Sequence, residues 1–138
     1  MLTGILHATS GHINVLGLDP AKQRNKLVYK VGAVFGQTSR LRYHLTARDT
    51  FILMGKLFDI PKEKLEKRIE YLVNKFEIRD MINKPVRKLS LGQRMRCEIV
   101  SSLIHSPEII FLDEPTIGLD MIAKQKLRET INEINQTE

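Results

Sequence analysis

Two consecutive carboxylates, Asp113 and Glu114, follow four apolar residues in the stretch IIFLDEP at 109–115. Such an apolar run is typical of a parallel strand buried on both faces, and open α/β sheets hold ligands at the carboxyl ends of these strands. Either acid alone would be an ordinary strand end. Both together, followed by Pro115, predict one acid beside Mg²⁺ and one that activates water, as phosphoryl transfer requires.

A second candidate stretch is LSLGQRMR at 89–96. Ser90 and Gln93 have the S-x-x-Q spacing of a capping box, in which each side chain satisfies a backbone donor at the other position. An ordinary helix start needs nothing more. The start of a helix also presents amide donors and the positive end of its dipole, so a phosphate could be held there, with Gly92 permitting close approach. Arg94 and Arg96 are expected on the helix surface or in packing.

The elements that must position these residues can be predicted from the apolar patterns. Strand and helix alternate at both ends of the chain, with a helical region between them, which predicts an α/β fold in one folding unit. We expect strands at 12–17, 30–37 and 109–112, a short helix capped by Asp19 that begins at Pro20 and continues through Gln23 to Leu27, helices at 46–60, 61–78 and 90–105, and a last helix with Leu127, Ile131 and Ile134 on its apolar face.

Composition limits the classes of protein. With 138 residues, 42% hydrophobic and 28% charged, the chain is about one domain and is not expected to be disordered. Its longest apolar runs, of four residues, are too short to span a bilayer. The net charge of +6 makes anionic partners plausible. Acids alternate with bases in residues 61–76 and aromatic residues are few, so no nucleic-acid partner is expected.

The remaining reactive side chains predict no chemistry of their own. Cys97 is the single cysteine, cannot form an internal disulfide, and is expected to be a small packing residue. The four histidines lack the short spacing to other ligands that a metal site needs. They are His7, His12, His44 and His105.

Four motifs in order, VFGQ, LSLGQRMR, IIFLDEP and TIGLD, together resemble the ATP-binding subunit of an ABC transporter. Leu89 to Gln93 match the signature motif, and Ile109 to Asp113 match the Walker B strand. The motifs are most similar to those of bacterial exporters of drugs and antibiotics. The implied fold is a partial P-loop NTPase core in a single domain, 1–138, with a helical subdomain inserted at about 38–105.

The resemblance also implies cofactors, partners and roles. ATP and Mg²⁺ are the expected cofactors, and a second ATP-binding subunit and a transmembrane permease are the expected partners. The permease would contact the helical insert, placing the protein in the cytoplasm, peripheral on the inner face of the cell membrane. The family pattern assigns the catalytic glutamate to Glu114, Mg²⁺ to Asp113 and Gln37, and nucleotide binding to Gln37, Ser90, Gly92, Gln93 and Asp120.

Departures from the family pattern predict that the ATPase site is incomplete. Leu91 replaces a glycine of the commoner signature motif. The phosphate-binding loop, G-x-x-x-x-G-K-[ST], is absent, since Gly55 and Lys56 in MGKLF belong to a predicted helix interior. No histidine follows Asp120, so the switch histidine is also missing. These departures predict a fragment that is inactive as an ATPase by itself.

Two alternatives stay open at this point. One is an ABC ATPase acting in translation or DNA repair, where similar motifs occur. The other is a non-enzymatic interaction fragment of a disrupted gene. The helical insert is compact and lacks a long arm or coiled coil, which favours the transporter. The sequence does not identify a transported substrate.

Overall fold

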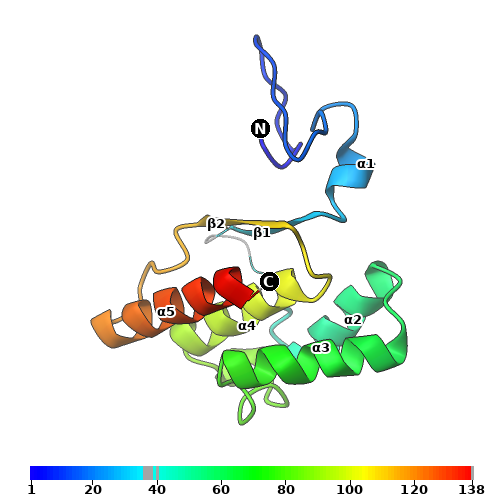
Figure 1. Ribbon diagram of the computed structural model, residues 1–138. Helices are drawn as coiled ribbons and strands as arrows, with labels where there is room; N and C mark the ends of the chain where they lie inside the picture. Colours follow the sequence, from blue (N-terminus) through cyan, green and yellow to red (C-terminus); the bar gives the residue numbers. More distant parts are fainter. Residues whose placement is uncertain (36–38, 40, 138) are drawn as a thin grey trace.

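Two parallel strands packed on helices form the centre of the computed structural model, which describes residues 1–35, 39 and 41–137 (Figure 1). The expected position of Gln37 lies outside the described residues. The elements in order are α1 (Arg24–Leu27), β1 (Val31–Phe35), α2 (Ala47–Leu57), α3 (Lys62–Lys75), the 3₁₀ turn η1 (Val86–Lys88), α4 (Leu91–Leu103), β2 (Ile109–Asp113) and α5 (Met121–Thr137).

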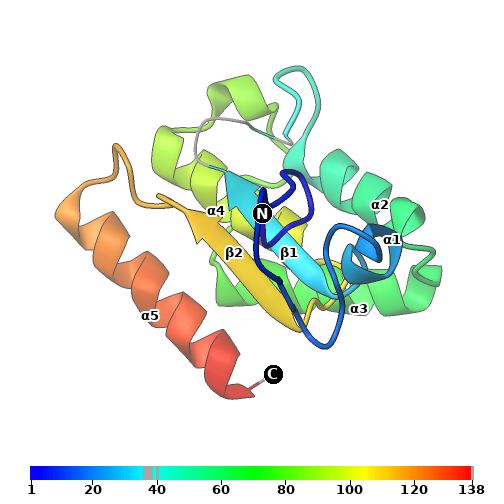
Figure 2. The same cartoon turned by 90° about the horizontal axis from the view of Figure 1, so that it is seen from above.

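The sheet brings together strands from distant parts of the chain. β1 pairs with β2 in parallel, from Val31 opposite Ile109 to Phe35 opposite Asp113. Parallel pairing requires a crossover connection, and here α2, α3 and α4 supply it. In Figure 2, α5 lies on the β2 side of the sheet and α2 lies on the β1 side. The carboxyl ends of both strands therefore meet at one edge, where Asp113 is located.

The expectation that residues 109–112 are buried on both faces is wrong. These four residues are only partly buried, and Asp113 is exposed. Figure 1 shows the reason, because α4 and α5 cover one face of the strands while the N-terminal segment rises away from the other. An apolar run cannot distinguish one covered face from two.

The predicted strand at 12–17 is also wrong, and the short helix after it forms only at Arg24–Leu27, as α1, without the expected start at Pro20. Val15 and Leu18 exchange two backbone hydrogen bonds of 2.9 Å across a tight turn. Leu16 and Gly17 both have positive φ, 53° and 76°, and Asn14 Oδ1 accepts from the Gly17 amide at 2.9 Å. This turn reverses the chain where the alternating pattern predicted an extended segment.

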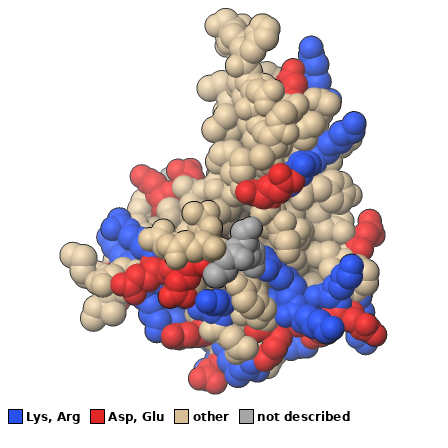
Figure 3. All heavy atoms as spheres, viewed as in Figure 1, with Lys and Arg blue, Asp and Glu red and all other residues tan. Residues whose placement is uncertain are grey.

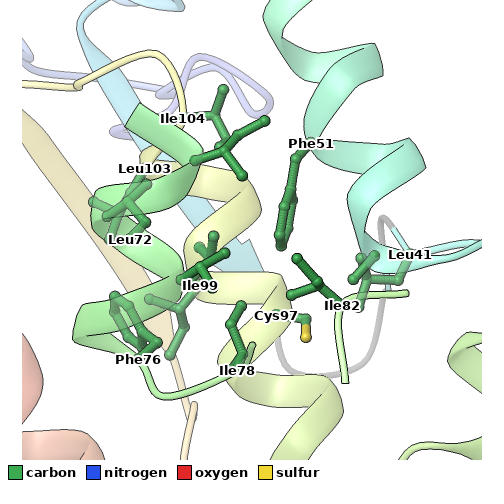
Figure 4. Packing of buried hydrophobic residues seen from close by; sticks show 14 of the residues in the cluster. Leu41, Phe51, Leu72, Phe76, Ile78, Ile82, Cys97, Ile99, Leu103 and Ile104 are labelled. Carbon is green, nitrogen blue, oxygen red and sulfur yellow. The ribbon is translucent and has the colours of Figure 1, made fainter. Parts of the chain in front are cut away.

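The helices share one apolar core (Figure 4). Phe51 from α2, Phe76 after α3 and Ile99 from α4 are almost completely buried within it. Cys97 is also fully buried, and burial raises the pKa of its thiol to about 12, so its predicted packing role is confirmed. Gly55 lies inside α2 against Leu65, as its predicted helix-interior position required.

A buried carboxylate joins α4 to the segment that precedes α2. Glu98 is 6% exposed, and its Oε1 accepts a hydrogen bond from the Leu41 amide at 3.2 Å and another from the Ser39 hydroxyl. A buried acid is stable only when its acceptors are satisfied, so these contacts fix residues 39 and 41 on α4. The sequence analysis missed this link, although an acid inside the apolar run CEIVSSL was a signal for it.

Charge is distributed unevenly over the molecule. Figure 3 shows basic and acidic side chains mixed over the helical part, while the projecting N-terminal segment is mostly uncharged. Within residues 1–35, 39 and 41–137, no helix combines the length and apolar character needed to cross a bilayer.

Candidate functional site

The first candidate site is the N-terminus of α4. The Ser90 hydroxyl accepts from the Gln93 amide at 3.2 Å, and Gln93 Oε1 accepts from the Ser90 amide at 2.9 Å, which confirms the predicted capping box. The box uses the amides of Ser90 and Gln93 and orients the first turn of the 13-residue helix. Amides of that turn and the exposed hydroxyl remain at the positive end of the helix dipole.

A turn at 116–120 packs directly against this helix start through two reciprocal contacts. A Cβ on Gly118 would lie 2.5 Å from Leu91 Cδ2, and a Cβ on Gly92 would lie 3.4 Å from Leu119 Cδ2. Each leucine therefore covers a glycine of the other segment. Leu91, the departure from the commoner motif, is accommodated because Gly118 has no side chain and adopts φ +70°.

Asp120 begins the next helix beside this contact. Its Oδ1 accepts from the Ala123 amide at 2.8 Å, which caps α5. Ser90, Gly92, Gln93 and Asp120 thus line one hollow of about 640 Å³. The structure brings together four residues that the sequence analysis had assigned to nucleotide binding.

Two basic residues also line this hollow, and both have partners. Arg96 Nη1 donates to the Phe76 carbonyl at 3.3 Å, so its predicted packing role is confirmed. Lys126 pairs with Glu77, and this hydrogen bond lowers the pKa of Glu77. The hollow is therefore lined by the donors at the tip of α4 and by the remaining N–H groups of these two basic side chains.

The predicted catalytic and metal-binding carboxylates lie elsewhere. Asp113 and Glu114 are exposed at the end of β2 and do not line the hollow. Glu114 has φ +50°, and its carbonyl accepts from the Ile117 amide at 3.2 Å, so the chain turns sharply after the strand. The described candidate residues therefore form two groups, the α4 tip with Asp120 and the acidic end of β2.

The acidic group suits Mg²⁺ as part of a nucleotide complex. Carboxylate oxygens are ligands that Mg²⁺ prefers, and this ion usually keeps waters and phosphate oxygens as its other ligands. Within residues 1–35, 39 and 41–137, no three His, Cys, Asp or Glu side chains gather to hold a metal. Two exposed acids that share an ion with phosphate and water fit this pattern, whereas a closed structural metal site does not.

The arrangement defines an α/β nucleotide-binding protein of the P-loop NTPase type, with acids at the end of a parallel strand and a capped helix tip. A family model described as ABC transporter matches residues 1–117. The chain belongs to the ABC transporter family. Proteins of this family bind ATP, generally with Mg²⁺, and their ATP-binding subunits associate with transmembrane permeases.

Curated relatives support the predicted subgroup. The chain is 34% identical to the ABC transporter ATP-binding protein NatA of Bacillus subtilis over 136 residues, which are 99% of this chain and 55% of that protein. It is 31% identical to the bacitracin transport ATP-binding protein BcrA of Bacillus licheniformis, covering 97% of this chain and 42% of that protein. The chain therefore spans about half the length of these relatives.

A solved structure confirms the predicted fold class. CbiO1 from Clostridium perfringens, described as part of the ABC transporter complex cbiONQ, superposes with a TM-score of 0.82 at 26% identity. The match covers 99% of this chain and 55% of that one. The named relatives are transport proteins, which favours transport over the translation or repair alternative.

Proposed function

We propose that this chain is part of the ATP-binding and ATP-hydrolysing subunit of an ABC transporter that drives export across a membrane. Support for export comes from the similarity to a bacitracin transport protein and to the daunorubicin resistance protein DrrA3 of Streptomyces coeruleorubidus, which is 31% identical over 97% of this chain and 42% of that protein. The observation that carries the proposal is the separation of two groups, a donor-rich helix tip and an exposed acidic strand end.

The separation is best explained by two subunits that enclose ATP between them. Ser90, Gly92 and Gln93 present the α4 tip to a phosphate bound mainly by the partner subunit. A phosphate can approach closely at Gly92, because only Leu119 lies near the position of an added Cβ. Asp120 keeps its own turn beside this tip by capping α5.

The acidic strand end acts on the other side of the nucleotide. Bound Mg²⁺ neutralises phosphate charge, and Asp113, together with Gln37, is assigned to hold it. Glu114 is assigned to orient and deprotonate the attacking water, which it can reach because its side chain is exposed. The printed sequence has no phosphate-binding loop, so we expect little turnover from these 138 residues by themselves.

The test therefore uses the natural gene product that carries these residues and measures ATP hydrolysis and ATP binding separately. Glu114→Gln should lower kcat by about 10²- to 10⁴-fold, the usual contribution of a general base, while ATP binding changes little. Glu108→Gln is a matched control, because Glu108 is also exposed and flanks the other end of β2, paired with Lys30. Equal activities of the two variants would contradict the role of Glu114.

Gly92→Ala tests the helix tip in the same assay. The added methyl group finds room in the fold, since its nearest contact outside the helix backbone is Leu119 Cδ2 at 3.4 Å. We expect an unchanged melting temperature and a clear loss of turnover, because the methyl group obstructs the approaching phosphate. Full turnover in Gly92→Ala would show that the α4 tip does not contact the phosphate during hydrolysis.

We further propose that the helical insert contacts a permease and that the protein works at the cytoplasmic face of the membrane. Leu53 and Leu57 lie one turn apart on α2, and are 54% and 65% exposed. Leu53→Asp with Leu57→Asp should reduce co-purification with the permease. Val28→Asp, at another exposed apolar position, is the control. Equal recovery of the permease with both variants would exclude this face.

A further inference from the structure

The strongest feature outside the nucleotide site is a surface formed by two loops, residues 42–46 and 84–88, called here the basic loop pair. The loops are joined by the Thr46–Pro85 bridge and by hydrogen bonds from the Val86 amide to the Leu45 carbonyl, 3.0 Å, and from the Arg87 amide to the Tyr43 carbonyl, 3.2 Å. Residues distant in the sequence are therefore held side by side by the backbone itself.

The basic loop pair gathers cations without acids among them. No Asp or Glu occurs anywhere in residues 20–48 or 81–97. Its charged side chains are exposed, and within the described part of the chain none of them forms an ion pair. These cations are Arg42, Lys84, Arg87 and Lys88, and His44 lies between them.

The surroundings do not neutralise this surface. Asp49 on α2 lies against this surface, because its carboxylate accepts from the Thr46 hydroxyl and amide. These hydrogen bonds lower its pKa, so Asp49 is a negative charge beside the four cations. Asp80 precedes the second loop and is exposed. Five basic residues elsewhere in the described part of the chain have glutamate partners, as in Arg48 with Glu66 at 2.9 Å. The basic loop pair therefore keeps an excess of positive charge available to an external partner.

Apolar side chains lie among these cations. Tyr43 is 54% exposed and Leu45 is 41% exposed. Arg94 holds Tyr43 in place, since its Nη1 donates to the Tyr43 hydroxyl at 3.1 Å and its guanidinium lies 5.2 Å from the ring centroid. Tyrosine and basic residues together are characteristic of segments that lie in the headgroup region of a membrane.

We propose that the basic loop pair binds the anionic lipid headgroups of a membrane surface. The occupant is identified by charge complementarity, since four exposed cations outnumber the two nearby acids, Asp49 and Asp80, and exposed Tyr43 and Leu45 belong to the same loops. A planar anionic surface can contact both loops at once, because their basic side chains are all exposed. This inference goes beyond the proposed function, since it requires neither ATP nor a permease.

The experiment measures co-sedimentation of the chain with vesicles. One set contains phosphatidylcholine with about one third phosphatidylserine and the other contains phosphatidylcholine alone. Binding should require phosphatidylserine and should weaken as salt is added, because salt screens exposed charges. Arg87→Glu with Lys88→Glu should reduce binding at least about 20-fold, since each basic residue near an anionic leaflet contributes about a factor of five.

The matched control is Lys64→Glu with Lys67→Glu on α3, where acids are already interleaved with bases. Both double variants lower the net charge from +6 to +2, because each replacement changes the charge by two. The control should retain binding within about threefold, since its residues lie outside the surface. A second variant, Arg42→Glu with Lys84→Glu, should also reduce binding to the phosphatidylserine vesicles. Melting curves identify any variant that is unfolded.

Three outcomes would overturn the lipid assignment. The first is equal binding to both kinds of vesicle. The second is an equal loss in the α3 control, which would mean that net charge alone decides. The third is tighter binding, dependent on Arg87 and Lys88, to duplex DNA, an acidic peptide or Mg·ATP than to the anionic vesicles. The vesicle measurements contain no ATP, so their result is independent of the hydrolysis test above.

Discussion

Replacement of Gly55 by alanine should destabilise the protein, although the same change usually stabilises a helix. Alanine is favoured over glycine inside helices by about 1 kcal/mol. In α2, however, the added Cβ would lie 2.3 and 2.5 Å from the two terminal methyl carbons of Leu65, which is 5% exposed on α3. Overpacking of this kind costs typically about 1–3 kcal/mol. We expect a net loss of up to about 2 kcal/mol in the free energy of unfolding.

The assay is urea unfolding followed by circular dichroism, with the Leu65→Ala background as the decisive comparison. Leu65→Ala alone should cost about 2–5 kcal/mol, because it leaves a cavity in the core. In that background the clash is absent, so Gly55→Ala should become stabilising by up to about 1 kcal/mol. A reversal of sign between backgrounds is a coupling that only contacting residues produce.

Gly92→Ala is the control, since the same replacement in α4 meets only Leu119 Cδ2 at 3.4 Å and should not destabilise the fold. The reasoning is refuted if Gly55→Ala raises stability in the wild-type background, or if its effect is the same with and without Leu65. Either result would mean that α2 and α3 do not approach closely at Gly55.

Two further predictions concern buried groups of α4. Burial raises the pKa of Cys97 from 9.0 to about 12, so its contribution to stability is complete below about pH 9 and is lost as the pH rises towards 12. Cys97→Ala should remove this part of the pH dependence in urea unfolding, and a thiol reagent at pH 8 should label the native protein only through unfolding. Glu98→Ala should cost about 1–3 kcal/mol and accelerate hydrogen exchange at the Leu41 amide, whereas Glu98→Gln, which keeps an acceptor oxygen, should lose less. Unchanged Leu41 exchange in Glu98→Ala would show that the buried carboxylate does not hold this segment.

The helices were predictable because their signals are local. The expected helices at 46–60 and 61–78 appear as α2 (Ala47–Leu57) and α3 (Lys62–Lys75), and the box between Ser90 and Gln93 forms as its spacing predicts. Periodicity and capping act over three or four residues, so the sequence contains them directly. The wrong strand at 12–17 shows the corresponding limit, since a tight turn at Leu16 and Gly17 overrode a short alternating pattern.

Long-range features could be predicted only where a motif implied them. The link between Glu98 and Ser39 joins residues 59 positions apart, and nothing near either residue specifies its partner. The partial burial of β2 depends on which layers cover the sheet, which the composition of the strand cannot show. The resemblance assigned both Ser90 and Asp120 to nucleotide binding, but it did not predict that they line one hollow of this chain or that leucine and glycine contacts bring them together.

Those contacts suggest how the two groups of site residues communicate. Glu114 and Asp120 are six residues apart, and the segment between them is shortened by hydrogen bonds from the Ile117 amide to the Glu114 carbonyl and from the Leu119 amide to the Thr116 carbonyl, both 3.2 Å. A short, hydrogen-bonded segment transmits displacement better than a flexible one. This segment therefore joins the acidic end of β2 to Leu119, which lies against the tip of α4 at Gly92. Leu91, which stands where the commoner motif has glycine, covers Gly118 and adds a second contact between the segment and α4.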